Sequence, residues 1–116
     1  MLTNKDYCDY ETCVALKELG YNAPQRLIPD YFGVFGEPQY DERIHLYDAQ
    51  KWLREKHNLH IEITYSPSCW TGRIYYLKEW DYIKGFTFFE SFEDTLYTLI
   101  NEAVKILKKK QHEKDI

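Results

Sequence analysis

The chain has 116 residues, of which 44% are hydrophobic, 17% aromatic and 29% charged, a composition that excludes an intrinsically disordered protein. Its length suffices for one hydrophobic core, so we expect residues 1–116 to form a single domain. The formal net charge is −4, with −5 in residues 1–48 and +1 in the remainder. This balance argues against non-specific binding of DNA or RNA, which requires a surplus of Lys and Arg.

The first predicted element is a helix over residues 9–19, which Gly20 follows as a C-terminal stop. Residues 22–45 contain three prolines and two glycines, which interrupt any helical period. We therefore expect a long irregular acidic segment here, either a functional loop or a pair of short strands. A strand at 31–35, or a fourth strand of the sheet drawn from residues 27–35, is compatible with this pattern.

A second helix is indicated by the shared face of Ala49, Trp52 and Leu53, with Asn58 as its left-handed stop. The hydrophobic period then changes to two around Ile61, which predicts a half-buried strand. Aromatic-rich runs at residues 73–79 and 82–89 follow and fit an antiparallel meander with short turns.

The last helix begins at Ser91, whose hydroxyl can cap it while Asp94 lies three residues on. Polar residues 111–116 are expected to fray. The sequence thus predicts an α+β domain with an N-terminal helix, then a helix, a three-stranded antiparallel meander and a closing helix, the helices covering one sheet face. The apolar stripe expected to pack the last helix on the sheet consists of Phe92, Leu96, Leu99, Ile100, Ala103 and Leu107.

Residues 11–21 (ETCVALKELGY) and 46–63 (LYDAQKWLREKHNLHIEI) resemble small uncharacterised proteins encoded on bacterial prophages and other mobile elements. Residues 90–107 match more loosely, and residues 22–45 depart from the group. The resemblance implies a genomic context and a shared fold, and it assigns no activity and no functional residue.

Three cysteines, Cys8, Cys13 and Cys69, and an N-terminus without a basic and then apolar stretch favour a cytoplasmic protein. No apolar run approaches the ~20 residues of a membrane-spanning helix. On one continuous helix Cys8 and Cys13 would be separated by about 140°, so we expect small buried residues rather than shared ligands. Cys69 lies in a loop without a sequence neighbour that would activate it.

His57, His60 and Glu62 cluster within six residues and are the candidates for a metal or proton-sharing site of a small enzyme. Their spacing matches no metal-ligand motif, so solvent-facing positions on a helix end and a strand explain them better. No other motif has catalytic or cofactor-binding spacing. We accordingly expect no catalytic residue, no cofactor and no metal.

The order helix, three strands, helix between residues 47 and 110 matches the topology of a double-stranded RNA-binding domain. That family carries lysines at the start of its final helix, where this chain has Glu93 and Asp94, which would repel phosphate. A nucleic-acid-binding module is therefore the second hypothesis, and topology alone is a weak argument for it.

The high aromatic content favours an interaction surface, because Tyr and Trp combine an apolar body with a polar tip. Our leading hypothesis is a non-catalytic accessory protein that binds another protein or itself, for instance as a homodimer. The residues predicted to form the interaction surface are Tyr31, Phe32, Phe35, Trp70, Trp80 and Tyr82.

Overall fold

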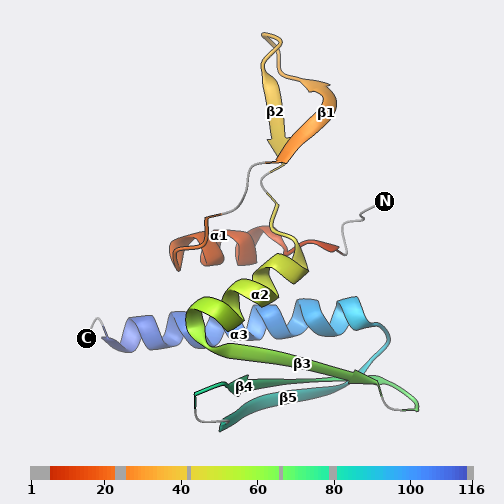
Figure 1. Ribbon diagram of the computed structural model, residues 1–116, viewed down its shortest axis with the longest axis vertical. Helices are drawn as coiled ribbons and strands as arrows, with labels where there is room; N and C mark the ends of the chain where they lie inside the picture. The colour runs from red at the N-terminus through yellow and green to blue at the C-terminus, as the bar shows by residue number, and fades with distance from the viewer. Residues whose placement is uncertain (1–5, 23–25, 42, 66, 79–80, 115–116) are drawn as a thin grey trace.

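The computed structural model describes residues 6–22, 26–41, 43–65, 67–78 and 81–114, and it shows an α+β body from which a β-hairpin projects (Figure 1). The predicted fold class and the order helix, three strands, helix are confirmed. In chain order the elements are α1 (Tyr10–Glu18), β1 (Arg26–Phe32), β2 (Pro38–Asp41), α2 (Leu46–His57), β3 (Leu59–Tyr65), β4 (Trp70–Tyr76), β5 (Asp81–Phe89) and α3 (Phe92–Lys114).

The core lies between α3 and the antiparallel sheet, whose strand order is β3-β4-β5. Helix α3 contacts all three strands as well as α1 and α2, and α2 also contacts β3. Ile61 of β3 and Ile74 of β4 are directly paired, and both are buried beneath the helices. The residues of the predicted α3 stripe that have no exposed surface are Leu96, Leu99, Ile100 and Ala103.

Helix α3 approaches the sheet most closely at Gly72 of β4. A Cβ atom built on Gly72 would lie 2.0 Å from Cδ1 of Leu99 and 2.8 Å from Cγ2 of Thr95. Both of these α3 side chains are fully buried, so neither has free space into which it could move. Because Gly72 has no side chain, α3 can pack at this short distance from the sheet.

The predicted helix ends are largely confirmed. The backbone N–H of Asp94 donates to Oγ of Ser91 at 3.0 Å, as expected for an N-cap. Helix α2 stops at Asn58, which adopts the left-handed conformation with φ of 56°. Helix α3 continues to Lys114, so residues 111–114 are helical rather than frayed as predicted.

The meander is present, but β4 is shifted relative to its predicted position at residues 73–79. It begins at Trp70, because Trp70 pairs with Tyr65 across the β3–β4 connection. Strand β5 agrees closely with the prediction for residues 82–89. Residues 79–80, which include Trp80, lie outside the described residues.

The central part of residues 22–45 forms the antiparallel hairpin of β1 and β2, which is the pair of short strands left open by the sequence and not an irregular loop. The hairpin is a separate two-stranded sheet and not a fourth strand of the meander. Its turn is closed by the N–H of Gly36, which donates to the carbonyl of Gly33 at 3.0 Å. Gly36 has φ of 79°, a conformation that favours glycine. Pro29 and Pro38 obscured the strand pattern in the sequence.

Helix α1 is attached to α3 by a small polar network. Tyr97 donates to Oδ2 of Asp9 at 2.6 Å, and the N–H of Thr12 donates to Oδ1 of Asp9 at 2.7 Å. The hydroxyl of Thr12 donates to Oδ1 of Asn101 at 2.6 Å. Burial raises the pKa of Asp9, but these hydrogen bonds outweigh it and hold the pKa below its ordinary value.

We predict that Gly72→Ala lowers the free energy of unfolding by about 1–3 kcal/mol, because the added methyl group overpacks a filled core. Urea unfolding measures this change. Gly85→Ala in β5 is the matched control, since the nearest atom to its added Cβ is the hydroxyl of Tyr82, an exposed side chain that can turn away. Its effect should stay below about 1 kcal/mol. Equal losses in both variants would contradict the role given to Gly72.

We also predict that Tyr97→Phe destabilises the fold by about 1 kcal/mol at pH 7. Because the folded pKa of Asp9 is depressed, the stability that its carboxylate contributes is present above the unfolded pKa of about 3.9 and is lost as the pH falls through the folded value. The difference between wild type and variant should therefore shrink in acid. Tyr10→Phe, which removes an exposed hydroxyl, should show no such pH dependence.

Candidate functional site

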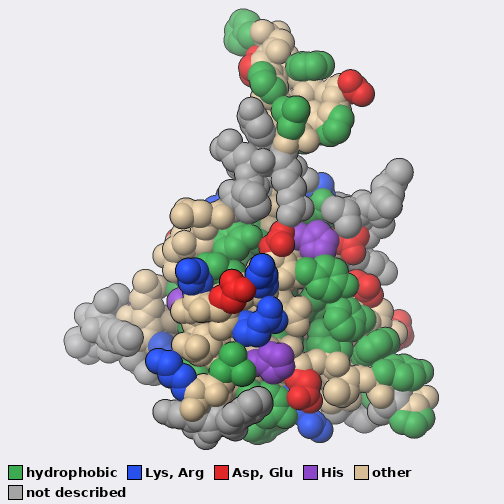
Figure 2. All heavy atoms as spheres, in the orientation of Figure 1, with side chains coloured by type: hydrophobic (Ala, Val, Ile, Leu, Met, Phe, Trp, Pro, Cys, Tyr) green, Lys and Arg blue, Asp and Glu red, His purple; other side chains and the backbone are tan. Residues whose placement is uncertain are grey.

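The turn of the β1–β2 hairpin carries large apolar side chains in solvent. Val34 and Phe35 at its tip are each 93% exposed, and Tyr31 and Phe32 of β1 are 62% and 64% exposed. Leu27 lies lower on the same hairpin and is also exposed. Figure 2 shows these hydrophobic side chains standing clear of the body. The structure thus brings the predicted residues Tyr31, Phe32 and Phe35 together on one projecting element.

Sequence reasoning missed Val34 and Leu27 as members of this surface. A signal for the tip was present, because residues 33–36 read Gly-Val-Phe-Gly, with two apolar residues between two turn-forming ones. A turn by itself offers no neighbouring side chains against which apolar residues could pack. Their position therefore points to contact with another molecule.

Six rings on the body form a continuous series of contacts, which we call the aromatic ladder, with centroid separations between 4.9 and 6.1 Å. Half-buried Trp70 lies within it, between Tyr65 and Phe92. Figure 2 shows a band of hydrophobic side chains on the right of the body, next to the start of α3. In order, the rings are Tyr7, His45, Tyr47, Phe92, Trp70 and Tyr65.

The ladder begins at the root of the hairpin. The guanidinium carbon of Arg43, which follows β2, lies 4.0 Å from the centroid of Tyr7, a cation–π distance. Acidic residues flank the ladder in sequence: Asp48 follows Tyr47, and Glu93 and Asp94 follow Phe92. Stacked rings beside carboxylates do not suit a nucleic acid, whose phosphates these charges would repel.

Tyr82 lies on a different surface from Trp70. It pairs with Tyr75 of β4 on the sheet face that points away from the helices, with ring centroids 5.8 Å apart, and it is 59% exposed. The predicted interaction residues therefore occupy separate parts of the molecule, the hairpin, the ladder and the outer sheet face. Trp80 lies outside the described residues.

The predicted cluster of His57, His60 and Glu62 does not come together as a site. His57 at the end of α2 stacks edge-on against Trp52 at a centroid distance of 4.7 Å. On β3, His60 is paired opposite Tyr75, and Glu62 lies 3.9 Å from Nη1 of Arg73. Among the described residues no group of three His, Cys, Asp or Glu side chains could hold a metal ion.

Cys8 and Cys13 are both buried, as predicted, but the separation calculated for one continuous helix does not apply to them. Helix α1 starts at Tyr10 with Asp9 as its N-cap, so Cys8 precedes the helix and is free of its period. The Sγ of Cys13 lies 3.7 Å from the carbonyl oxygen of Cys8, and both residues line one cavity. Only the residue at which α1 begins shows that Cys8 and Cys13 lie close together.

Comparison with protein-family models, with curated proteins and with solved structures found no match to this chain. The resemblance to proteins of mobile elements therefore stays a prediction. None of the described helices is both long and apolar enough to span a lipid bilayer.

We predict that the pKa of His57 lies below the ordinary 6.5, because burial disfavours its charged form. Trp52→Ala opens this contact and should move the pKa of His57 upwards. Titration followed by NMR of the imidazole carbon-bound protons measures the shift, with the signals of the other histidines as the reference. An unchanged titration of His57 in the variant would contradict the contribution of Trp52.

Proposed function

We propose that this chain is an accessory protein that binds another protein through the side chains of the β1–β2 hairpin, and that this binding involves no catalysis by the hairpin. The observation that carries the proposal is the exposure of Tyr31, Phe32, Val34 and Phe35 on an element that projects from the body. Soluble domains rarely leave such side chains together in solvent unless another molecule covers them.

The energetics favour a binding role for the hairpin over a structural one. A two-stranded hairpin is at best marginally stable in water by itself. Burying a Phe side chain contributes about 1.5–3 kcal/mol, before the costs of ordering are subtracted. At the hairpin tip this gain is not realised within the chain, so it is available to a partner that provides an apolar pocket.

Side chains rather than strand edges are the expected means of binding. Pro29 in β1 and Pro38 in β2 have no backbone N–H to donate to an added strand. Asp30 has φ of 56°, and the pairing register shifts between Leu27 and Phe32. These interruptions oppose edge-to-edge pairing. They support a mode in which Phe35 and its neighbours insert into a groove.

The aromatic ladder adds a second apolar region on the body, and its first ring, buried Tyr7, lies against Arg43 near the hairpin root. Its exposed members Tyr47 and Tyr65 are residue types that interfaces favour. A partner seated on the hairpin would therefore meet a second apolar region on the body.

Binding of double-stranded RNA is the second candidate, and the arrangement of α2, β3 to β5 and α3 supports it. The charges do not. Glu93 lies in the first turn of α3, where that mode of binding needs cations, and Asp30 and Glu37 make the hairpin acidic. Protein binding is therefore the better interpretation.

The test compares wild type with the triple variant Tyr31→Ala, Phe32→Ala, Phe35→Ala. The triple variant should lose a nuclease-resistant protein partner in affinity capture, with binding weakened at least about tenfold in titration against that partner. Light scattering over a concentration series determines whether the partner is a second copy of the chain. Because all three side chains are exposed, thermal unfolding of the body should be nearly unchanged.

Tyr82→Ala is the matched control, since Tyr82 is exposed to a similar degree but lies on the outer sheet face. It should retain binding. Loss of binding in Tyr82→Ala with retention in the triple variant would move the interface to the sheet. Capture that disappears after nuclease treatment would favour the RNA-binding hypothesis.

A further inference from the structure

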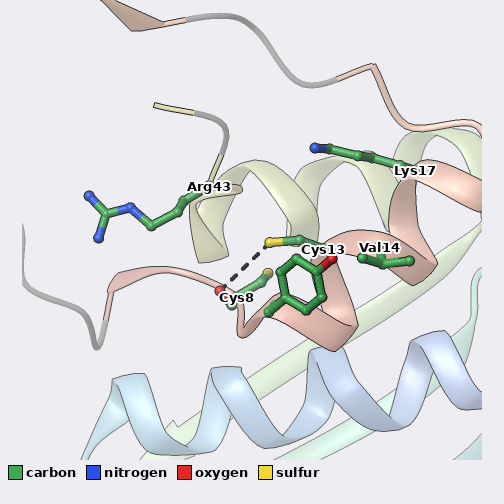
Figure 3. A pocket seen from close by; sticks show the side chains of 6 residues that line it. Cys8, Cys13, Val14, Lys17 and Arg43 are labelled. Carbon is green, nitrogen blue, oxygen red and sulfur yellow. Dashed lines mark hydrogen bonds between the residues drawn. The ribbon is translucent and has the colours of Figure 1, made fainter. Parts of the chain in front are cut away.

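Cys8 and Cys13 face each other in a cavity beside the start of α1 (Figure 3). They are only 5% and 8% exposed, and Sγ of Cys13 lies 3.7 Å from the carbonyl oxygen of Cys8. A backbone hydrogen bond also holds Cys8 in place, since the N–H of Cys8 donates to the carbonyl of Ile44 at 2.8 Å. Two thiols are thus held together by segments that the rest of the fold anchors.

The cavity has a volume of about 280 Å³, room for a small molecule beside the sulfur atoms. Among the described residues that line the cavity, two are cations, Lys17 one helical turn beyond Cys13 and Arg43 from the segment after β2, and none is acidic. The charge of Lys17 favours a negatively charged Cys13 sulfur, whereas the guanidinium of Arg43 lies over the ring of Tyr7 and points away from the two sulfurs (Figure 3). The described residues that line the cavity are Cys8, Tyr10, Cys13, Val14, Lys17 and Arg43.

The two thiols differ in acidity. The neighbouring Cys8 thiol, the backbone at Ile44 and the charge of Lys17 hold the pKa of Cys13 below its ordinary value, against the opposing effects of burial and Asp9. The hydrogen bond with Cys13 and burial raise the pKa of Cys8. The Cys13 thiol also donates to the carbonyl of Cys8 at 3.7 Å, a contact that is lost when Cys13 ionises. One sulfur is therefore suited to attack and the other to keep its proton.

We propose that Cys13 and Cys8 are a nucleophile and resolving pair that reduces small hydroperoxides and closes an intramolecular disulfide. The thiolate of Cys13 attacks the terminal peroxide oxygen, the O–O bond breaks, and the departing alkoxide takes a proton to become an alcohol, leaving a sulfenic acid on Cys13. The sulfur of Cys8 then attacks Sγ of Cys13, and its proton leaves with the hydroxide as water. In total two thiols and one hydroperoxide give one disulfide, one alcohol and one water, and a dithiol reductant restores the pair.

A metal site is the less suitable use of these thiols, because structural zinc needs four ligands and no third donor joins them among the described residues. Cys69 is near the start of β4 and does not line this cavity, so it provides an internal reference. The inference is independent of the proposed protein binding, since it rests on a cavity in the body and not on the hairpin.

The test treats the reduced full-length protein with a stoichiometric amount of hydrogen peroxide and follows the thiols by mass spectrometry. We expect the loss of two hydrogen atoms, a peptide disulfide between Cys8 and Cys13, and a Cys69 that stays open to alkylation. In Cys8→Ser, dimedone should trap a sulfenic acid on Cys13. In Cys13→Ser, peroxide consumption should fall at least about tenfold.

Cys69→Ser is the matched control and should behave as wild type. A disulfide that includes Cys69, oxidation of Cys69 before Cys13, or equal peroxide consumption in Cys13→Ser would overturn the proposal. Capture of the reduced pair by phenylarsine oxide, which bridges neighbouring thiols, tests their proximity separately from peroxide chemistry. Failure of this capture in a folded wild-type protein would also overturn it.

Discussion

The close seating of α3 on the sheet is the contact on which the other parts of this molecule depend. It completely buries Leu96, Leu99, Ile100 and Ala103 of the apolar stripe, and it requires a residue without a side chain at Gly72. The same helix contacts α1, α2 and all three strands of the meander. Because one buried helix holds these elements, the body can be stable even though the chain is short. A change in that contact would loosen α1, α2 and the three-stranded sheet together.

Because the core of the body does not need the β1–β2 hairpin, the hairpin is available for another role. The tip residues Val34 and Phe35 add nothing to the core and remain in solvent, where apolar side chains are unfavourable. The fold tolerates this exposure because the hairpin is separate from the core. A partner can therefore bind at the tip without disturbing α3. The aromatic ladder differs in this respect, because Phe92 begins α3 and so links a surface feature directly to the core.

The cysteine pair depends on α3 in a less direct way. Asp9 caps α1 and accepts a hydrogen bond from Tyr97 of α3, so the start of α1 is set by a contact with the central helix. That start leaves Cys8 outside the helix and Cys13 within it, which places the two sulfurs at one cavity. The carboxylate of Asp9 therefore contributes to the stability of the fold and also helps to set the positions of the two thiols.

Local signals in the sequence determined the elements of the body. The capping hydroxyl of Ser91, the left-handed stop at Asn58 and the period-two run around Ile61 each act over a few residues, and each prediction is confirmed. Only the tertiary structure decided how separate parts meet. The hairpin was hidden because Pro29 and Pro38 interrupt the strand pattern, and pairing between β1 and β2 is a contact between segments. The aromatic ladder and the contact of Cys13 with Cys8 likewise join residues whose relation depends on packing, which no local pattern encodes.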